Sequence, residues 1–259
     1  MSVLPSFAFE KVTGARHLRA GKPCQDDVGA TAAGSFVALA VADGHGTSTF
    51  AEVGAALAIR GVLPALIQFA AELGPRATDL ASVQAWADHP LRVQLVRDWV
   101  DRVRTHADDP ATDLSAFGST LVFVLATPDF LLFGQLGDGD VLVVDPDGSV
   151  TSPLPADPAV FGDETPSLCQ PEAWMALRVR VTPPPSPGTL VLLATDGYSK
   201  SYPTDEEFRR IGPDYAALLT DGGLQALAPH LHDFLEEVTT RGSGDDIALG
   251  LLHWPRERQ

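Results

Sequence analysis

The chain has 259 residues and a formal net charge of −16, from 34 acidic and 18 basic residues. This acidity disfavours nucleic acid and anionic membranes as partners, because both repel a negative protein surface. Hydrophobic residues make up 45% of the sequence, enough to build a sizeable core in one large domain over residues 1–259. The two cysteines, Cys24 and Cys169, form neither a disulfide framework nor a zinc-ligand spacing, which favours a reducing compartment.

The first residues lack the basic flank and apolar run of a signal peptide. No stretch of the sequence approaches the roughly 20 apolar residues that a membrane helix needs. We therefore expect a cytoplasmic protein that does not contact a membrane.

In chain order, residues 7–10 are expected to form a first strand and residues 14–27 a polar, basic loop that ends in two carboxylates. Two interpretations of this loop stay open: a site that serves an anion and a cation at once, or a surface loop with ordinary charges. The apolar run 36–41 predicts a buried strand. It leads into Asp43-Gly44-His45-Gly46, which brings a carboxylate, a backbone carbonyl and an imidazole close together. A plain strand-to-helix turn with an incidental histidine is the alternative interpretation of this stretch.

Two helices are expected next. Thr49 to Glu52 has the form of a capping box at the start of the first helix, and Pro64 predicts a kink or boundary within it. The break at Gly74-Pro75 ends this helical region. The second helix places four apolar residues on one face for core packing. They are Leu91, Leu95, Trp99 and Val103.

Strand patterns return at 121–125, 130–136 and 141–144, and these tightly joined strands must be antiparallel. Segment 151–187 is rich in Pro, Asp and Ser and is expected to contain a mobile flap. A second buried strand over 189–194 again ends in Asp-Gly, at Asp196, before helical segments. Their apolar stripe consists of Leu224, Leu227, Leu231, Phe234, Leu235 and Val238. The last strand, 247–252, follows directly after two aspartates.

Five aspartates lie at strand ends or in glycine-flanked turns: Asp26, Asp43, Asp138, Asp196 and Asp245. Buried carboxylates repel one another, so either each lies apart at its own strand end or a cation holds them together. An all-oxygen ligand set favours Mg²⁺, Mn²⁺ or Ca²⁺ over zinc, and the spacing of an EF-hand calcium loop is absent. Two hard cations that share a carboxylate are a common means of activating water against a phosphate ester.

Six motifs in chain order carry a resemblance to a known family: Gln25-Asp26, Asp43-Gly44-His45-Gly46, Gly118-Ser119-Thr120, Gly137-Asp138, Asp196-Gly197 and Gly244-Asp245-Asp246. The set resembles the metal-dependent serine/threonine protein phosphatases of the type 2C (PPM) family, bacterial 2C-like subgroup. The resemblance implies an α+β fold, a four-layer αββα sandwich in which two packed antiparallel β-sheets are flanked by helices.

The resemblance also implies two Mn²⁺ or Mg²⁺ ions, or three if a weaker site is filled. Asp43 would bridge two ions and Gly44 would lend its carbonyl to one of them. Asp196 and Asp245 would complete the other, Asp26 would assist, and Asp138 matches a third, weaker metal position. A metal-bound water would attack phosphorus directly, and His45 matches the general acid that protonates the leaving alkoxide. The implied catalytic residues are therefore Asp43 and His45.

The sequence departs from the family at one position. Many members carry an arginine that grips the phosphate four residues before the Glu or Gln of the first motif, whereas this chain has Gly21, followed by Lys22. Lysine lacks the bidentate fork of arginine, so the phosphate contact would be weaker or differently aimed. Lys22 and His17 are the candidate phosphate-binding residues.

The family implies removal of phosphate from phosphoserine and phosphothreonine in proteins, with a phosphoprotein substrate and a serine/threonine kinase of the same pathway as candidate partners. Two alternatives stay open at this point. One is a catalytically weak phosphatase fold that acts as a regulatory binding module, and the other is a phosphatase of small phosphate esters.

Overall fold

The computed structural model describes residues 4–74, 79–154, 165–219 and 222–256. Its strands form two antiparallel five-stranded sheets. The first sheet has the order β1 (Ser6–Val12), β10 (Ile247–His253), β9 (Leu190–Ala194), β6 (Asp140–Val144) and β7 (Val150–Thr151). The second sheet has the order β2 (Asp27–Ala33), β3 (Phe36–Ala42), β4 (Leu121–Ala126), β5 (Leu131–Leu136) and β8 (Arg178–Thr182).

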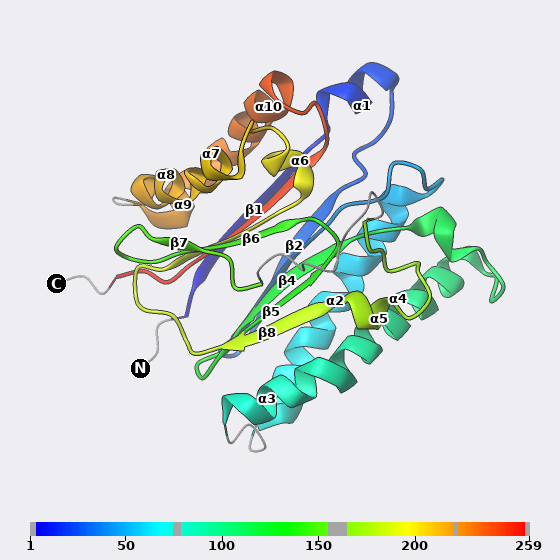
Figure 1. Cartoon of the computed structure of the whole chain (residues 1–259), viewed down its shortest axis with the longest axis horizontal. Helices are drawn as coiled ribbons and strands as arrows, with labels where there is room; N and C mark the ends of the chain where they lie inside the picture. The colour runs from blue at the N-terminus through cyan, green and yellow to red at the C-terminus, as the bar shows by residue number, and fades with distance from the viewer. Residues whose placement is uncertain (1–3, 75–78, 155–164, 220–221, 257–259) are drawn as a thin grey trace.

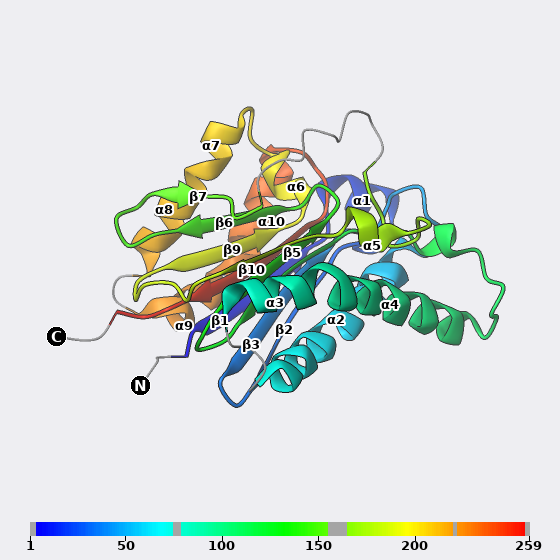
Figure 2. The ribbon, with the colours of Figure 1, turned by 60° about the horizontal axis from the view of Figure 1, so that its bottom comes forward.

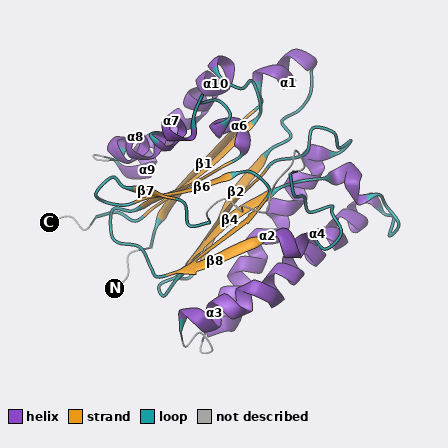
Figure 3. Ribbon diagram, viewed as in Figure 1, coloured by secondary structure: helices purple, strands orange, loops and turns teal. Residues whose placement is uncertain are grey.

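Helices cover the outer face of each sheet (Figure 1). On the second sheet lie α2 (Ala51–Leu73), α3 (Leu80–Trp86), the π-helical turn η2 (Ala87–Leu91), α4 (Arg92–Ala107), the 3₁₀ turn η3 (Leu114–Phe117) and α5 (Ala173–Ala176). On the first sheet lie α6 (Asp196–Ser199), α7 (Asp205–Arg209), α8 (Ile211–Leu218), α9 (Gly223–Leu227), the 3₁₀ turn η4 (Ala228–His230) and α10 (Leu231–Arg241). The short α1 (Ala15–Ala20) lies at one end of the sandwich (Figures 1 and 3). The predicted four-layer αββα sandwich is therefore confirmed.

The period-two pattern of the strands explains the layering. In β3, Ala38 and Ala40 face the helical layer that contains α2, while Leu39 and Val41 face the other sheet. Small residues on the helix side let α2 approach the sheet closely, and larger ones fill the space between the sheets. The core thus consists of two helix–sheet layers and one sheet–sheet layer, and Figure 2 shows the arrangement from a second side.

The start and the interior of α2 differ from the prediction. The helix begins at Ala51 with Phe50 as the N-cap residue and no side-chain cap bond, so the predicted capping box at Thr49 is wrong. Contacts from elsewhere in the chain fix this end instead, because the backbone N–H of Phe50 donates to the carbonyl of Ala116 at 2.8 Å. The helix also continues through Pro64, so the predicted boundary there is wrong, while a kink at this residue stays a prediction. Pro64 is exposed, so water can solvate the carbonyl that its ring leaves unpaired.

By length and composition, α2 could cross a membrane: it has 23 residues and its most apolar window has a mean hydropathy of 1.7. The expectation that no segment reaches this threshold is therefore wrong. Within the fold, α2 packs against β2, β3 and α4, and 56% of that window is buried. Its place in the core accounts for its apolar composition.

Two segments expected to be irregular contain regular structure. The predicted loop 14–27 includes α1, which ends at Gly21 in the left-handed conformation with φ of 64°, a region that favours glycine. In the predicted flap segment 151–187, residues 155–164 lie outside the described residues. The later part contains α5 and β8, and β8 forms the edge of the second sheet by pairing with β5. The sequence pattern also did not reveal β2 or α3.

A buried leucine between the sheets should contribute more to stability than one exposed on α1. Leu39 is fully buried, whereas Leu18 is 61% exposed. We expect Leu39→Ala to lower the free energy of unfolding by about 2–5 kcal/mol, because it removes apolar burial and leaves a cavity. The matched control Leu18→Ala should change the free energy of unfolding by less than about 0.5 kcal/mol. Urea denaturation of both variants measures this difference, and similar losses would contradict the assigned core.

Candidate metal centre

The predicted ligands lie where several strands begin or end at the same edge of the sandwich. The end of β3 lies beside the start of β2, with Ala42 opposite Asp27. The end of β9 lies beside the starts of β6 and β10, and Ala194 is opposite Asp140. Because neighbouring strands are antiparallel, segments far apart in sequence meet at this edge. The residues just beyond these strand ends are Asp26, Asp43, Asp138, Asp196 and Asp245.

Three of these aspartates converge. Asp43, Asp138 and Asp196 each offer a carboxylate oxygen, and these oxygens all lie within 4.8 Å of one another. Burial raises the pKa of Asp43 well above its ordinary value, and the charges of Asp26, Asp196 and Asp138 raise it further. Burial, followed by the charge of Asp138, raises the pKa of Asp196 to about 6. We call these three residues the carboxylate cluster.

Asp26 lies directly behind the cluster. Its side chain is 3% exposed, and its carboxyl group is hydrogen-bonded to that of Asp43. The hydroxyl of Thr195 donates to Asp26 Oδ2 at 2.5 Å. Burial raises the pKa of Asp26 to about 8, although the bond from Thr195 acts in the opposite direction. Asp26 therefore connects the cluster to the end of β9.

The ladder between β3 and β4 continues past the strands and fixes the turn that carries Asp43. Gly44 bridges Ser119, and the N–H of Thr120 donates to the carbonyl of Asp43 at 2.8 Å. In return, the N–H of Asp43 donates to the hydroxyl of Thr120 at 2.9 Å. The N–H of His45 donates to the carbonyl of Gly118 at 3.0 Å. The predicted motif 118–120 therefore holds the turn in place.

Gly44 occupies a position that only glycine fits. A Cβ there would lie 2.5 Å from the carbonyl oxygen of Ala51 and 2.7 Å from that of Gln25. The backbone N–H of Gly44 donates to the same Gln25 carbonyl at 3.1 Å. The close approach lets the backbone at residue 44 line the hollow beside the cluster.

His45 follows the cluster and is partly buried. Its Nε2 is inaccessible to solvent and has no hydrogen-bond partner among the described residues. Burial lowers the pKa of His45, and the nearby charge of Asp138 opposes that shift. An unpaired imidazole nitrogen beside the cluster is a group that can exchange a proton with a bound ligand.

Asp246, which the prediction did not assign, ties the first loop to the last strand. It is 3% exposed, and its Oδ1 accepts from the backbone N–H of Gly14 at 2.6 Å. Its Oδ2 accepts from the N–H of Gln25 at 2.6 Å and lies 2.8 Å from His17 Nδ1. The sequence signal was present in the adjacent pair of aspartates before β10, but only the fold shows which one faces inward.

The other predicted residues lie around the cluster. Asp245 and His17 line the same hollow as Asp43, but Asp245 is outside the group of three converging carboxylates. Lys22 is exposed and does not line this hollow in the part of the chain described. Its role as a phosphate contact stays a prediction.

Lys200 is a site residue that the prediction missed. Its ammonium donates to Asp196 Oδ2 in a very short hydrogen bond and lies 3.7 Å from Asp138 Oδ2. Partial burial lowers the pKa of Lys200, but the hydrogen bond to Asp196 and the charges of Asp138 and Asp43 outweigh it and raise the pKa. The spacing of four residues from Asp196, one helical turn, is the signal that could have revealed it.

These side chains surround a hollow of about 220 Å³. Its lining consists of His17, Gln25, Asp43, Gly44, His45, Gly46, Asp138, Thr165, Asp196, Lys200, Asp245 and Asp246.

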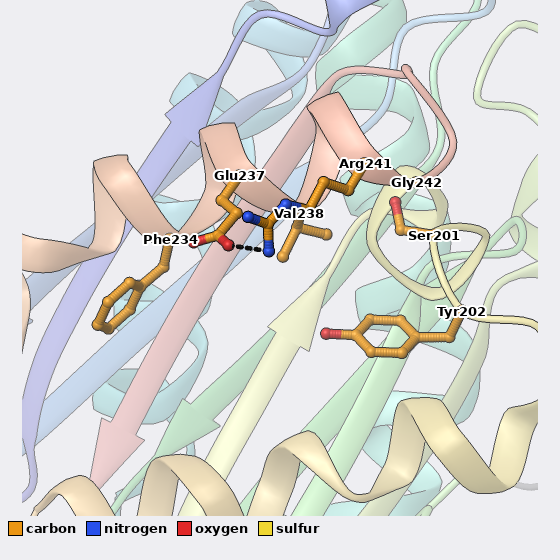
Figure 4. A pocket seen from close by; sticks show the side chains of 7 residues that line it. All are labelled: Ser201, Tyr202, Phe234, Glu237, Val238, Arg241 and Gly242. Atoms are coloured by element: carbon orange, nitrogen blue, oxygen red, sulfur yellow. Dashed lines mark ion pairs between the residues drawn. The ribbon is translucent and has the colours of Figure 1, made fainter.

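A separate hollow of about 370 Å³ lies beside α10, where Figure 4 shows Phe234 and Tyr202 near the Glu237–Arg241 ion pair. It contains none of the converging carboxylates. Phe234 is 37% exposed there, whereas Leu231 and Leu235 of the same predicted apolar stripe are fully buried.

The residues around the smaller hollow fit divalent metal ions. The donors are carboxylate and backbone oxygens, which Mg²⁺ and Mn²⁺ prefer. The carboxyl groups of Asp26 and Asp43 are hydrogen-bonded to each other, as are those of Asp138 and Asp196. Such like-charged pairs are stable only with a shared proton or a cation. The acidic cluster thus has the composition and the excess of negative charge of a divalent metal site.

Asp246 and its neighbour Asp245 offer a matched test of the scaffold. We expect Asp246→Asn to lower the free energy of unfolding by about 2 kcal/mol or more, because an amide nitrogen would face a backbone N–H donor. Asp245→Asn should cost less, since its carboxylate accepts from the Asp246 N–H at a longer 3.1 Å. Urea denaturation in the presence of a chelator measures both, and equal losses would contradict the assigned role of Asp246.

Comparison with solved structures supports the fold. The serine/threonine phosphatase of S. agalactiae is 16% identical, with a TM-score of 0.65 over 96% of this chain and 99% of that one. PstP/Ppp of Mycobacterium tuberculosis is 20% identical, with a TM-score of 0.60 over 98% of this chain and 100% of that one. The same values hold for the catalytic domain of PstP in complex with two manganese ions.

A search of curated protein sequences finds no match. Residues 13–236, most of the chain and all but one of the predicted motifs, match the family model for protein phosphatase 2C. Since the model covers well over half of the sequence, and the fold agrees with it, this chain belongs to the protein phosphatase 2C family.

Proposed function

We propose that the protein is a metal-dependent phosphomonoester hydrolase that removes phosphate from phosphoserine and phosphothreonine residues of proteins. The observation that carries this proposal is the convergence of Asp43, Asp138 and Asp196 within 4.8 Å in a chain of this family. The similar structures support the proposal through the fold that they share with this chain, and their activity is stated of those proteins alone.

Two Mn²⁺ or Mg²⁺ ions fit the cluster best. When bound, such ions lower the pKa of water and offset the charge of a phosphate group. Asp43 would be shared between the ions, with the Gly44 carbonyl as a further ligand of one and with Asp196 and Asp245 on the other. Asp26 would orient Asp43 through their hydrogen bond. Asp138, which matches a third, weaker metal position in the family, lies 3.7 Å from the Lys200 ammonium in this chain.

His45 would supply the proton that the leaving alkoxide needs. His45 lines the hollow beside the cluster, and its Nε2 has no hydrogen-bond partner among the described residues. Because this nitrogen is closed to solvent, the ring would have to turn to present it to a substrate phosphate. Burial lowers the pKa of His45, the negative charge of Asp138 opposes that shift, and a phosphate dianion would act in the same direction as Asp138. Transfer of this proton to the serine or threonine oxygen as the P–O bond breaks completes the reaction.

His17 and Lys22 are the proposed phosphate contacts. The Nδ1 of His17 is engaged with Asp246, which leaves Nε2 as the nitrogen that a phosphate oxygen could reach. Lys22 would have to reach the hollow from its exposed position. We propose a cytoplasmic protein whose phosphoprotein substrates are produced by a serine/threonine kinase of the same pathway.

Phosphate release from a phosphothreonine peptide, with and without Mn²⁺, tests the function. We expect release that needs Mn²⁺ and disappears with chelator, and at least a hundredfold loss in Asp43→Asn because a shared ligand is removed. The control is Asp129→Asn, which makes the same carboxylate-to-amide change in the exposed turn between β4 and β5. This variant should retain wild-type release.

Three results would contradict the proposal. Hydrolysis by metal-stripped protein would exclude the metal-dependent reaction. Metal binding without release from any phosphate ester would indicate a regulatory binding module. Faster release from sugar phosphates than from the peptide at equal concentration would indicate a phosphatase of small esters.

The leaving group tests the role of His45. We expect His45→Gln to slow hydrolysis of a phosphoserine peptide by about a hundredfold or more, the usual cost of lost acid catalysis. The loss should be smaller for nitrophenyl phosphate, because nitrophenolate leaves without needing a proton. Mn²⁺ titration of the variant is the control for weakened metal binding. Equal losses on the two substrates would mean that His45 only shapes the turn.

A further inference from the structure

Lys200 is in an unusual position for a basic residue in this chain. The sequence contains three lysines, Lys11, Lys22 and Lys200. Among the residues that line the hollow, Lys200 is the one lysine or arginine in the described part of the chain, and five aspartates share the lining with it. A single permanent positive charge thus lies in the most acidic part of an already acidic protein.

The backbone directs this ammonium to the cluster. Asp196 opens α6 and Lys200 follows one turn later, with the Lys200 N–H donating to the Asp196 carbonyl at 2.8 Å. The helical turn places both side chains on the same face. The Lys200 ammonium reaches Asp196 Oδ2, and Asp138 Oδ2 lies 3.7 Å away. The lysine therefore spans two of the three members of the carboxylate cluster.

Asp138 lies on the same side of the hollow as Lys200 and Thr165. Its Oδ2 faces the Lys200 ammonium and also accepts from the hydroxyl of Thr165 at 3.2 Å. This oxygen therefore has a hydrogen-bond donor and a positive charge beside it, on the side where a cation between Asp138 and Asp196 would lie. An additional divalent ion there would have to displace the ammonium and would meet its positive charge at close range.

We propose that Lys200 is a built-in cation of the carboxylate cluster, which occupies the side of Asp138 and Asp196 in place of a divalent ion and limits the site to two ions. It acts as a positioning and specificity-determining residue, because it neutralises Asp138 and fixes one oxygen of Asp196. The other oxygen of Asp196 stays available to a metal. The inference rests on the proposed metal-dependent function.

Direct measurement of bound Mn²⁺ tests this role without a measurement of activity. Isothermal titration of chelator-treated full-length protein with MnCl₂ would compare the wild type with Lys200→Met and Lys200→Asp. Arg97→Met makes the same change of charge at an exposed site on α4 outside the hollow and is the matched control. Lys200 is 57% exposed, so its replacement should leave the fold intact, which thermal denaturation checks.

We expect the wild type and Arg97→Met to bind two ions with equal affinity. Lys200→Met should bind its weakest ion about tenfold more tightly or better, because a positive charge within about 4 Å of the ion is removed. Lys200→Asp should bind a third ion, because it adds a ligand where the cation was. If Lys200→Asp fails to fold, the affinity of Lys200→Met decides.

Two results would overturn the role of Lys200 alone. One is an active wild type whose ion count and affinity are unchanged in both Lys200 variants. The other is wild-type metal binding by Lys200→Met together with a raised KM for the phosphothreonine peptide, which would make Lys200 a phosphate contact. A wild type that neither binds Mn²⁺ nor releases phosphate would instead overturn the proposed function together with this inference.

Discussion

Repulsion between buried carboxylates is the constraint on which the arrangement of this site depends. Burial raises the pKa of Asp26, Asp43 and Asp196, which means that the protein environment disfavours their charged forms. Gathering such groups costs free energy that only protons or cations can offset. The fold accepts this cost at one edge of the sandwich, where segments from both sheets meet. A cluster of this kind does not stabilise the fold, but it is suited to bind divalent ions.

The surrounding chain holds the carboxylates together despite their repulsion. The turn at Asp43 is fixed by reciprocal bonds with Thr120, so its direction does not depend on its charge. Asp246 joins the first loop to the last strand through backbone N–H groups, which are donors that titration cannot remove. Among the described residues of the lining, Lys200 is the one lysine or arginine. Hydrogen bonds with the backbone thus fix the positions of these side chains, and the charge of the cluster remains available to bind metal ions.

Much of the fold was predictable because its signals are local. The apolar runs that became β3 and β9 each end in an Asp-Gly turn, and their unbroken apolar sequence specifies burial on both faces. Elements fixed by distant contacts were not predictable: β8 has a polar, arginine-containing sequence and is a strand because it pairs with β5. In the site, Asp43 and Asp196 could be found from their turns. Lys200 follows Asp196 by one helical turn and Asp246 belongs to the aspartate pair before β10, so a local signal was present for both. That signal does not give their roles, which depend on the distant carboxylate or backbone groups that they face.

The position of metal in the cluster tests the account most directly. Crystals of the full chain grown with MnCl₂, with diffraction measured at the manganese absorption edge, would give anomalous density at each bound ion. We expect two peaks at the edge of the sandwich, both in contact with Asp43, and none between Asp138 and Lys200. Absence of any peak beside Asp43, or a peak between Asp138 and Asp196 with Lys200 turned away, would contradict it.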